Sequence, residues 1–192
     1  MSYPAEPWHL TGSLVMSLFT VPAHLIPHDH IPLAMSPITV AGRAFACVAF
    51  VDYGPDGMLA YQELLVGVLV RHGHRVFVSV PQIWVDSETS LRGGRELWAI
   101  PKQRAAFGQG AALAKVTATN GPKIPGRWSV PLRTAQRLDG CEVLTRSQIS
   151  GKPRFVRATW MFPAHGPLGY LAGNTPLASF ALADMKLTFG KP

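Results

Sequence analysis

Apolar residues run along this chain in short blocks that turn residues interrupt, a pattern typical of β-strands. Blocks rich in β-branched and aromatic residues predict strands over residues 12–21, 39–53, 59–71, 75–80, 111–119, 126–132 and 154–161. The sequences Gly-Pro-Asp-Gly at 54–57 and His-Gly-His at 72–74 predict turns. The strands between residues 39 and 80 are therefore expected to form a meander of hairpins.

A helix is predicted only over residues 86–98, DSETSLRGGRELW, where Asp86 or Ser87 can cap the N-terminus and Pro101 follows the end. The closing segment 177–187, LASFALADMKL, fits either a strand or a helix. No repeat or linker divides the sequence. It predicts a single domain over residues 1–192 of the α+β class. The sheet is mostly antiparallel, with a closed or cone-like β-barrel core and one or two short helices.

The composition narrows the class of protein. Charged residues make up 15% of the chain, against roughly 25% in an average domain. The most apolar window, 58–70, is too short for a membrane span and contains Glu63. The N-terminal segment lacks the basic and apolar regions of a signal peptide, and Cys47 and Cys141 give no disulfide framework. These features predict a cytoplasmic protein with no membrane partner, whose few charges favour a homo-oligomer.

The formal net charge of +7 raises the possibility of an anionic partner. The densest basic stretch, residues 145–160, has aromatic neighbours as an RNA-binding face would. We interpret it instead as a hairpin that turns at residues 150–153, with basic residues on its solvent face, and predict no nucleic-acid partner. The pairs His28/His30 and His72/His74 have no evident third ligand, so no metal site is predicted.

The stretch RGGRELWAIPKQRAAF, residues 92–107, contains the first candidate for chemistry. Lys102 follows Trp98, Ile100 and Pro101, and Phe107 stands a few residues beyond it. A lysine amine is nucleophilic only when it is neutral, and apolar surroundings favour that form. A neutral amine adds to ketones and forms an imine, or Schiff base. Taken alone, the same pattern also fits a surface lysine whose stem lies along apolar neighbours.

Glu63 is the second candidate, because it is the only charged residue in the window from 58 to 70. In a strand it shares one face with Tyr61 and Leu65. A carboxyl group in apolar surroundings can act as a general acid or base. The alternative from the local sequence is an outward-facing residue on a half-exposed strand.

The string GRELWAIPKQ, residues 94–103, resembles the signature of the acetoacetate decarboxylase family, in which Gly-Arg-Glu-Leu precedes Pro-Lys. The resemblance implies that Lys102 forms the Schiff base. Tyr61-Gln62-Glu63 matches the family's upstream glutamate, which implies the acid/base role for Glu63. Weaker similarity at residues 21–27 and 178–187 extends the resemblance over most of the chain. It implies the family's β-rich fold, a homo-oligomer, and chemistry that uses the lysine without a cofactor.

The chain departs from typical members in three positions. Gln103 replaces a second lysine, Thr11 lies near an expected arginine, and Val48 stands where another glutamate is expected. The pocket should therefore hold less charge, and desolvation by Trp98, Ile100 and Phe107 would keep the amine neutral. Six residues are predicted to line the pocket beside Lys102 and Glu63: Trp98, Ile100, Gln103, Val48, Tyr61 and Thr11.

These residues predict a lyase that acts through a lysine imine on a keto substrate larger and less polar than acetoacetate. The imine draws electrons from a broken carbon–carbon bond or from a lost α-proton. Decarboxylation, aldol chemistry, dehydration and cyclisation, plausible in natural-product biosynthesis, all remain open. The alternative is a non-covalent ligand-binding protein or cyclase on the same fold, in which Lys102 only positions the ligand.

Overall fold

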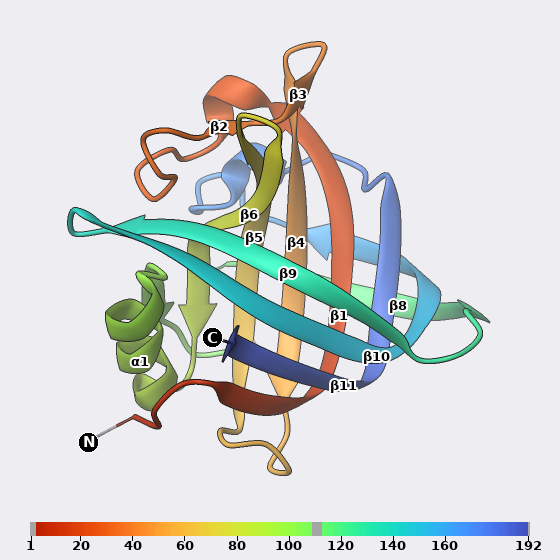
Figure 1. The fold of residues 1–192 in the computed structure, drawn as a ribbon. Helices are drawn as coiled ribbons and strands as arrows, with labels where there is room; N and C mark the ends of the chain where they lie inside the picture. The colour runs from red at the N-terminus through yellow and green to blue at the C-terminus, as the bar shows by residue number, and fades with distance from the viewer. Residues whose placement is uncertain (1–2, 109–112, 192) are drawn as a thin grey trace.

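The computed structural model describes residues 3–108 and 113–191. Among them, eleven strands join in one sheet, accompanied by one α-helix and two 3-10 turns (Figure 1). The elements in chain order are β1 (Trp8–Pro22), η1 (Ala23–Leu25), β2 (Ser36–Pro37), β3 (Thr39–Val40), β4 (Arg43–Tyr53), β5 (Tyr61–His72), β6 (Arg75–Val85), α1 (Glu88–Trp98), β7 (Lys102–Arg104), β8 (Lys115–Lys123), β9 (Trp128–Leu138), β10 (Cys141–Met161), η2 (Gly169–Leu171) and β11 (Ala178–Lys191).

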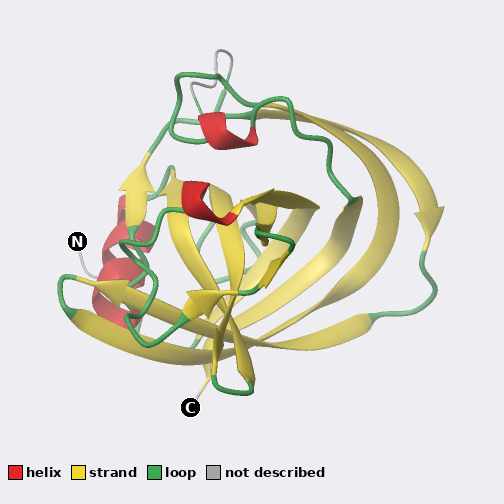
Figure 2. Ribbon diagram, turned by 90° about the horizontal axis from the view of Figure 1, so that it is seen from above, coloured by secondary structure: helices red, strands yellow, loops and turns green. Residues whose placement is uncertain are grey.

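Seven strands close into a barrel in the order β5-β4-β1-β11-β10-β9-β6, with β6 pairing back to β5. Neighbours in this ring are antiparallel except β6 and β9, which are parallel and pair at Val78 and Thr134. The long strands curve strongly around the molecule in the view from above (Figure 2). The predicted fold class, a mostly antiparallel closed or cone-like barrel with one or two short helices, is confirmed, and the structure has a closed barrel with one short α-helix.

The predicted meander is present, with two differences. The strand predicted over 39–53 is divided into β3 and β4, because Ala41 and Gly42 both have positive φ and form a turn. Strand β6 continues past Pro81 to Val85, where the prediction ended it at residue 80. Proline is tolerated there because the β5–β6 register shifts between Val66 and Val68, so the ladder is already interrupted.

The hairpin predicted at residues 150–153 is wrong. Residues 141–161 form the single strand β10, and the turn lies at Asp139-Gly140, between β9 and β10. Both turn residues have positive φ, as an Asp-Gly hairpin turn requires. Within β10, the predicted turn is only a shift of register against β11, between Ser150 and Lys152.

The remaining strand predictions are confirmed in type but not in extent. Strand β9 extends to Leu138, well beyond the predicted end at 132, and the closing segment is the strand β11. Part of the strand predicted over 111–119 lies outside the described residues, and β8 begins at Lys115. No helix in the described part of the chain is long and apolar enough to cross a membrane.

Buried apolar side chains form two groups on opposite faces of the strands. We call the group that packs against α1 the helix-side core; it includes Trp8, Leu10, Val51, Val85 and Trp98. The other group, here the second core, includes Phe19, Ala46, Val48, Val66 and Trp84. Side chains alternate along each strand, so neighbouring positions of β4 and β5 contribute to different cores.

Candidate active site

Glu63 reaches the helix-side core because of its position in β5. It pairs with Val51 of β4 on one side and with Val85 of β6 on the other, and both are buried in that core. Tyr61, two residues earlier on the same face, pairs with Tyr53. The connection over residues 54–60 joins β4 to β5 in this register, which places two tyrosines and the glutamate on one face.

Helix α1 brings Lys102 to the same place. The Ser87 hydroxyl caps the helix by accepting from the backbone N–H of Ser90. At the other end Ala99 adopts the left-handed conformation and donates its N–H to the carbonyl groups of the last turn. The chain then reverses, and β7 lies parallel to β6 with Lys102 opposite Ile83. The reversal at Ala99 and the pairing of β7 with β6 thus determine where the lysine side chain begins.

Gly94 makes room for the lysine stem. A Cβ atom at this position would lie 2.7 Å from Cδ and 2.8 Å from Cε of Lys102. Real Cβ atoms do not approach other atoms so closely, so any larger residue would displace the stem. This contact is a physical reason for the glycine in the Gly-Arg-Glu-Leu segment.

The amine of Lys102 makes three polar contacts inside the protein. Its Nζ donates to Glu63 Oε2 at 2.8 Å and to Ser90 Oγ at 2.8 Å, and lies 3.5 Å from the Tyr61 hydroxyl. It also lies 5.2 Å from the centre of the Tyr61 ring. Lys102 and Glu63 are each only 4% exposed. The lysine stem is thus buried against Gly94, while the amine itself is in a polar setting.

Two buried tyrosines complete the setting of the carboxylate. The Tyr53 hydroxyl donates to Glu63 Oε1 at 3.3 Å, and the two tyrosine rings lie 4.6 Å apart. Burial, followed by the negative charge of Glu63, raises the pKa of both Tyr53 and Tyr61 well above the ordinary value. Both phenols therefore stay protonated at neutral pH and can donate hydrogen bonds.

Among the other predicted pocket residues, Trp98 and Ile100 lie in the helix-side core with Tyr61. Gln103 is exposed, because it follows Lys102 in β7 and points the other way. Phe107, expected to desolvate the amine, instead packs against Phe50 beside the second core.

Thr11 and Val48 also lie on the face opposite Glu63. Thr11 follows Leu10, which belongs to the helix-side core, so the threonine points away from it. Val48 pairs with Val66 in the second core. The roles of these residues in substrate binding stay predictions.

Sequence reasoning missed two residues that contact the site, Ser90 and Tyr53. The signal for Tyr53 was misleading, because a turn at 54–57 alone pairs it with Met58, whereas the connection runs over residues 54–60 and pairs it with Tyr61. Ser90 lies one helical turn before Gly94, so both face the lysine. Ser90, Gly93 and Gly94 are small residues on the buried side of α1, and that pattern could have suggested a close approach.

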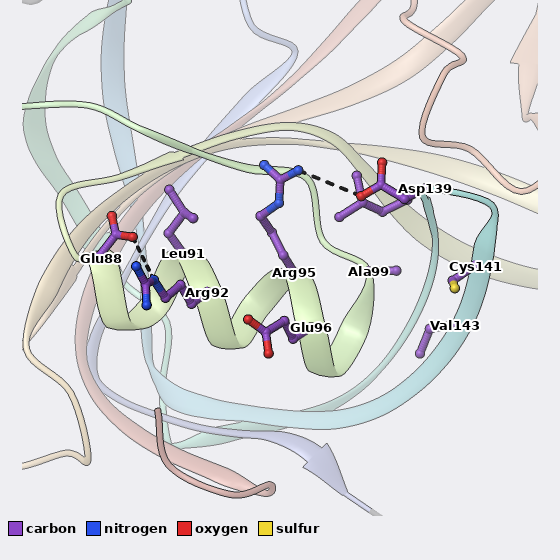
Figure 3. A pocket seen from close by; sticks show the side chains of 10 residues that line it. Glu88, Leu91, Arg92, Arg95, Glu96, Ala99, Asp139, Cys141 and Val143 are labelled. Atoms are coloured by element: carbon purple, nitrogen blue, oxygen red, sulfur yellow. Dashed lines mark hydrogen bonds and ion pairs between the residues drawn. The ribbon is translucent and has the colours of Figure 1, made fainter. Parts of the chain in front are cut away.

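A cavity of about 490 Å³ lies on the opposite side of α1 from Lys102. Figure 3 shows its helical lining residues, Glu88, Leu91, Arg92, Arg95, Glu96 and Ala99, across from Asp139, Cys141 and Val143. At 3.6 residues per turn, these positions face away from Ser90 and Gly94. Arg95 Nη2 lies 4.0 Å from Asp139 Oδ2, and Arg95 Nη1 donates to the Lys102 carbonyl oxygen at 3.4 Å, so Arg95 links the cavity lining to the backbone of Lys102.

No cluster of three or more histidine, cysteine or acidic residues suited to a metal ion occurs within residues 3–108 and 113–191. The groups gathered around Lys102 are a carboxylate, a serine and two phenols. They are suited to moving protons and to holding an amine rather than to binding a metal.

Solved structures of low sequence identity share this fold. The enduracididine biosynthesis enzyme MppR complexed with pyruvate is 18% identical, with a TM-score of 0.67 over 100% of this chain and 90% of that one. An acetoacetate decarboxylase from Legionella pneumophila is 16% identical, with a TM-score of 0.70 over 98% and 86%. An acetoacetate decarboxylase-like enzyme from Sphingomonas wittichii is 12% identical, with a TM-score of 0.54 over 97% and 92%.

No curated protein is significantly similar to the chain in sequence. The model of the family described as acetoacetate decarboxylase matches residues 29–126, about half of the chain, and that range contains Glu63, Ser90 and Lys102. This match agrees with the fold and with the GRELWAIPKQ segment. The chain belongs to the acetoacetate decarboxylase family.

Proposed function

We propose that this protein is a lyase in which Lys102 forms an imine with a keto substrate and Glu63 moves the substrate's proton. The observation that carries the proposal is the buried contact between Lys102 Nζ and Glu63 Oε2 at 2.8 Å. A lysine and a carboxylate that meet away from water can exchange a proton directly. That exchange yields a neutral amine, the form that attacks a carbonyl carbon.

The imine then acts as an electron sink for the neighbouring carbon. Electrons can come from a carbon–carbon bond that breaks or from an α-proton that a base removes. Glu63 lies against the amine that carries the imine, so it is the base within reach. Decarboxylation, aldol or retro-aldol chemistry, dehydration and cyclisation all use this arrangement.

The surroundings of the amine favour a substrate that is larger and less polar than acetoacetate. Within the described residues, Glu63 is the one charged side chain bonded to the amine. Tyr61 contacts the amine, and Tyr53, Trp98 and Ile100 belong to the same buried core, which offers aromatic and apolar area. One relative, MppR, has been solved with the condensation product of pyruvate and imidazole 4-carboxaldehyde, which supports carbonyl chemistry beyond decarboxylation and a role in natural-product biosynthesis.

A second candidate function is a non-covalent binding protein or cyclase. The observation that favours it is that the ammonium group already has three polar partners. A fully satisfied buried ion pair can be purely structural. In that case Lys102 would position a ligand or brace α1 without forming a bond to carbon.

Reductive trapping separates the two functions. The protein is incubated separately with 2-butanone, 2-octanone, pyruvate and acetoacetate. Each sample is then reduced with sodium borohydride, and the intact mass of the protein is measured. We expect one adduct per chain, strongest with 2-octanone, in the wild type and in Lys115→Ala, which removes an exposed lysine of β8. Lys102→Ala should form none. The absence of any adduct in the wild type, or an adduct that survives in Lys102→Ala, would contradict the imine.

A further inference from the structure

The three partners of the Lys102 amine correspond to the three protons of an ammonium group. Nζ lies 2.8 Å from Glu63 Oε2, 2.8 Å from Ser90 Oγ and 3.5 Å from the Tyr61 hydroxyl. Conversion of an ammonium and a ketone into a protonated imine and water moves two protons from nitrogen to oxygen. The third proton stays on the imine nitrogen. Two of the partners, Glu63 Oε2 and Ser90 Oγ, lie close enough to the nitrogen to accept the two protons that leave it.

Glu63 can carry only one of these protons at a time. It takes the first from the ammonium, which leaves a neutral amine, and returns it when the hydroxyl group of the carbinolamine departs as water. Between these steps, attack on the carbonyl gives a positive nitrogen and a negative oxygen. Glu63 is already protonated at this stage, so it cannot take the second proton from that nitrogen until it has given up the first. A hydroxyl group beside the nitrogen can carry the second proton to that oxygen without waiting for Glu63.

Ser90 is placed to do so. It is completely buried on the first turn of α1, and its hydroxyl accepts from the amine. Ser90 is thus one of the two oxygen partners that lie 2.8 Å from the nitrogen. Glu63, the other, also accepts a hydrogen bond from Tyr53 on its second oxygen at 3.3 Å.

We propose that Ser90 is a catalytic residue for imine formation, and that its hydroxyl takes the second proton from the Lys102 nitrogen while giving its own to the carbinolamine oxygen. The exchange leaves Ser90 unchanged, and both protons of the departing water come from the Lys102 ammonium group, one by way of Glu63 and one by way of Ser90. Tyr61, the most distant partner, faces the proton that the imine keeps. This role rests on the proposed function, because it requires that an imine forms.

The test is the rate of imine formation in Ser90→Ala. The enzyme is mixed with 2-butanone, samples are quenched with sodium borohydride over time, and the adduct is measured by intact mass. We expect formation to slow by roughly 10²-fold, the lower end of what positioned proton transfer contributes. Run in D₂O, the same samples report how many deuterons Glu63 has exchanged into each adduct. That number should be no lower than in the wild type, since Ser90 does not act on the α-carbon and slower hydrolysis only lengthens the life of the imine.

Two further variants distinguish proton transfer from placement of the helix. Ser90→Thr keeps the hydroxyl and should restore most of the rate. Ser87→Ala removes the helix cap without touching the amine, and should leave the rate close to that of the wild type. Trapping in Ser90→Ala at the wild-type rate, or an equal loss in Ser87→Ala, would overturn the role of Ser90 while leaving the imine intact. A wild type that forms no adduct would overturn both proposals.

Discussion

Two lysine–carboxylate pairs in this protein have nearly the same geometry and very different surroundings. Lys102 and Glu63 meet at 2.8 Å, and their side chains are each 5% exposed. Lys152 and Asp184, on β10 and β11, meet at 2.6 Å with side chains 63% and 57% exposed. The exposed pair is the shorter of the two, so distance does not distinguish them.

Burial is what gives the two pairs different properties. Water and salt screen the exposed charges, and such pairs contribute little to stability. A buried pair has lost its hydration, so each charge depends on its partner and on nearby hydrogen bonds. The proposed transfer of a proton between Lys102 and Glu63 relies on this burial. Substitutions at the two pairs therefore measure how far burial changes what a lysine–carboxylate pair contributes to stability.

Removal of one partner should affect the buried pair far more than the exposed pair. Lys102→Ala leaves the Glu63 charge buried without its counter-ion, which typically lowers the free energy of unfolding by ~3–5 kcal/mol. Lys152→Ala should remain close to the wild type. Urea unfolding followed by tryptophan fluorescence measures both variants under the same conditions.

The double variant Lys102→Met/Glu63→Leu sharpens this test. Replacement of both charges by apolar groups of similar size removes the desolvation cost, so much of the lost stability should return. Imine trapping should remain abolished. If the double variant were as unstable as Lys102→Ala, packing around the stem rather than the unpaired charge would explain the loss.

Gly94→Ala should separate chemistry from stability within the buried site. The new Cβ would overlap Cδ and Cε of Lys102 and push the amine away from Glu63 and Ser90. Alanine favours the helix by about 1 kcal/mol over glycine, which offsets part of the crowding cost of ~1–3 kcal/mol. We expect imine trapping to fall at least tenfold, with a net loss of stability no greater than about 2 kcal/mol. A fully active Gly94→Ala would show that the stem has another path.

The sequence predicted the parts of the fold and site that depend on local pattern. Alternation in β5 placed Tyr61 and Glu63 on one face, and the capped segment before Pro101 predicted α1. It could not predict partners that depend on how distant elements meet. Ser90 reaches Lys102 only because the chain reverses after Ala99, and Val48 lies in the second core because β4 pairs with β5 through Val51 and Glu63.

The prediction for β10 failed for a related reason. The sequence Ser-Gly-Lys-Pro at 150–153 has the composition of a turn, and local pattern alone gives no reason to reject it. Pairing with β9 on one side and β11 on the other holds this stretch extended. The Asp-Gly sequence at 139–140 is a stronger hairpin signal, and it forms the turn that precedes β10.

The smallest expected effect belongs to the exposed pair and depends on pH. The hydrogen bond from Lys152, followed by its positive charge, lowers the pKa of Asp184. A carboxyl group with a lowered pKa in the folded state stabilises the protein above its ordinary pKa, and that contribution disappears as the pH falls through the lowered value. Asp184→Asn should therefore be slightly less stable than the wild type at pH 7 and equally stable in strong acid. Asparagine is the matched change because residue 184 has a positive φ, which asparagine tolerates.

Salt should also distinguish the two pairs. Molar salt should erase the difference in stability between Asp184→Asn and the wild type at pH 7, because salt screens exposed charges far more than buried ones. The loss of stability in Lys102→Ala should remain. Urea unfolding at several pH values and two salt concentrations measures both effects, and a salt-resistant difference at Asp184 would contradict the contrast between the two pairs.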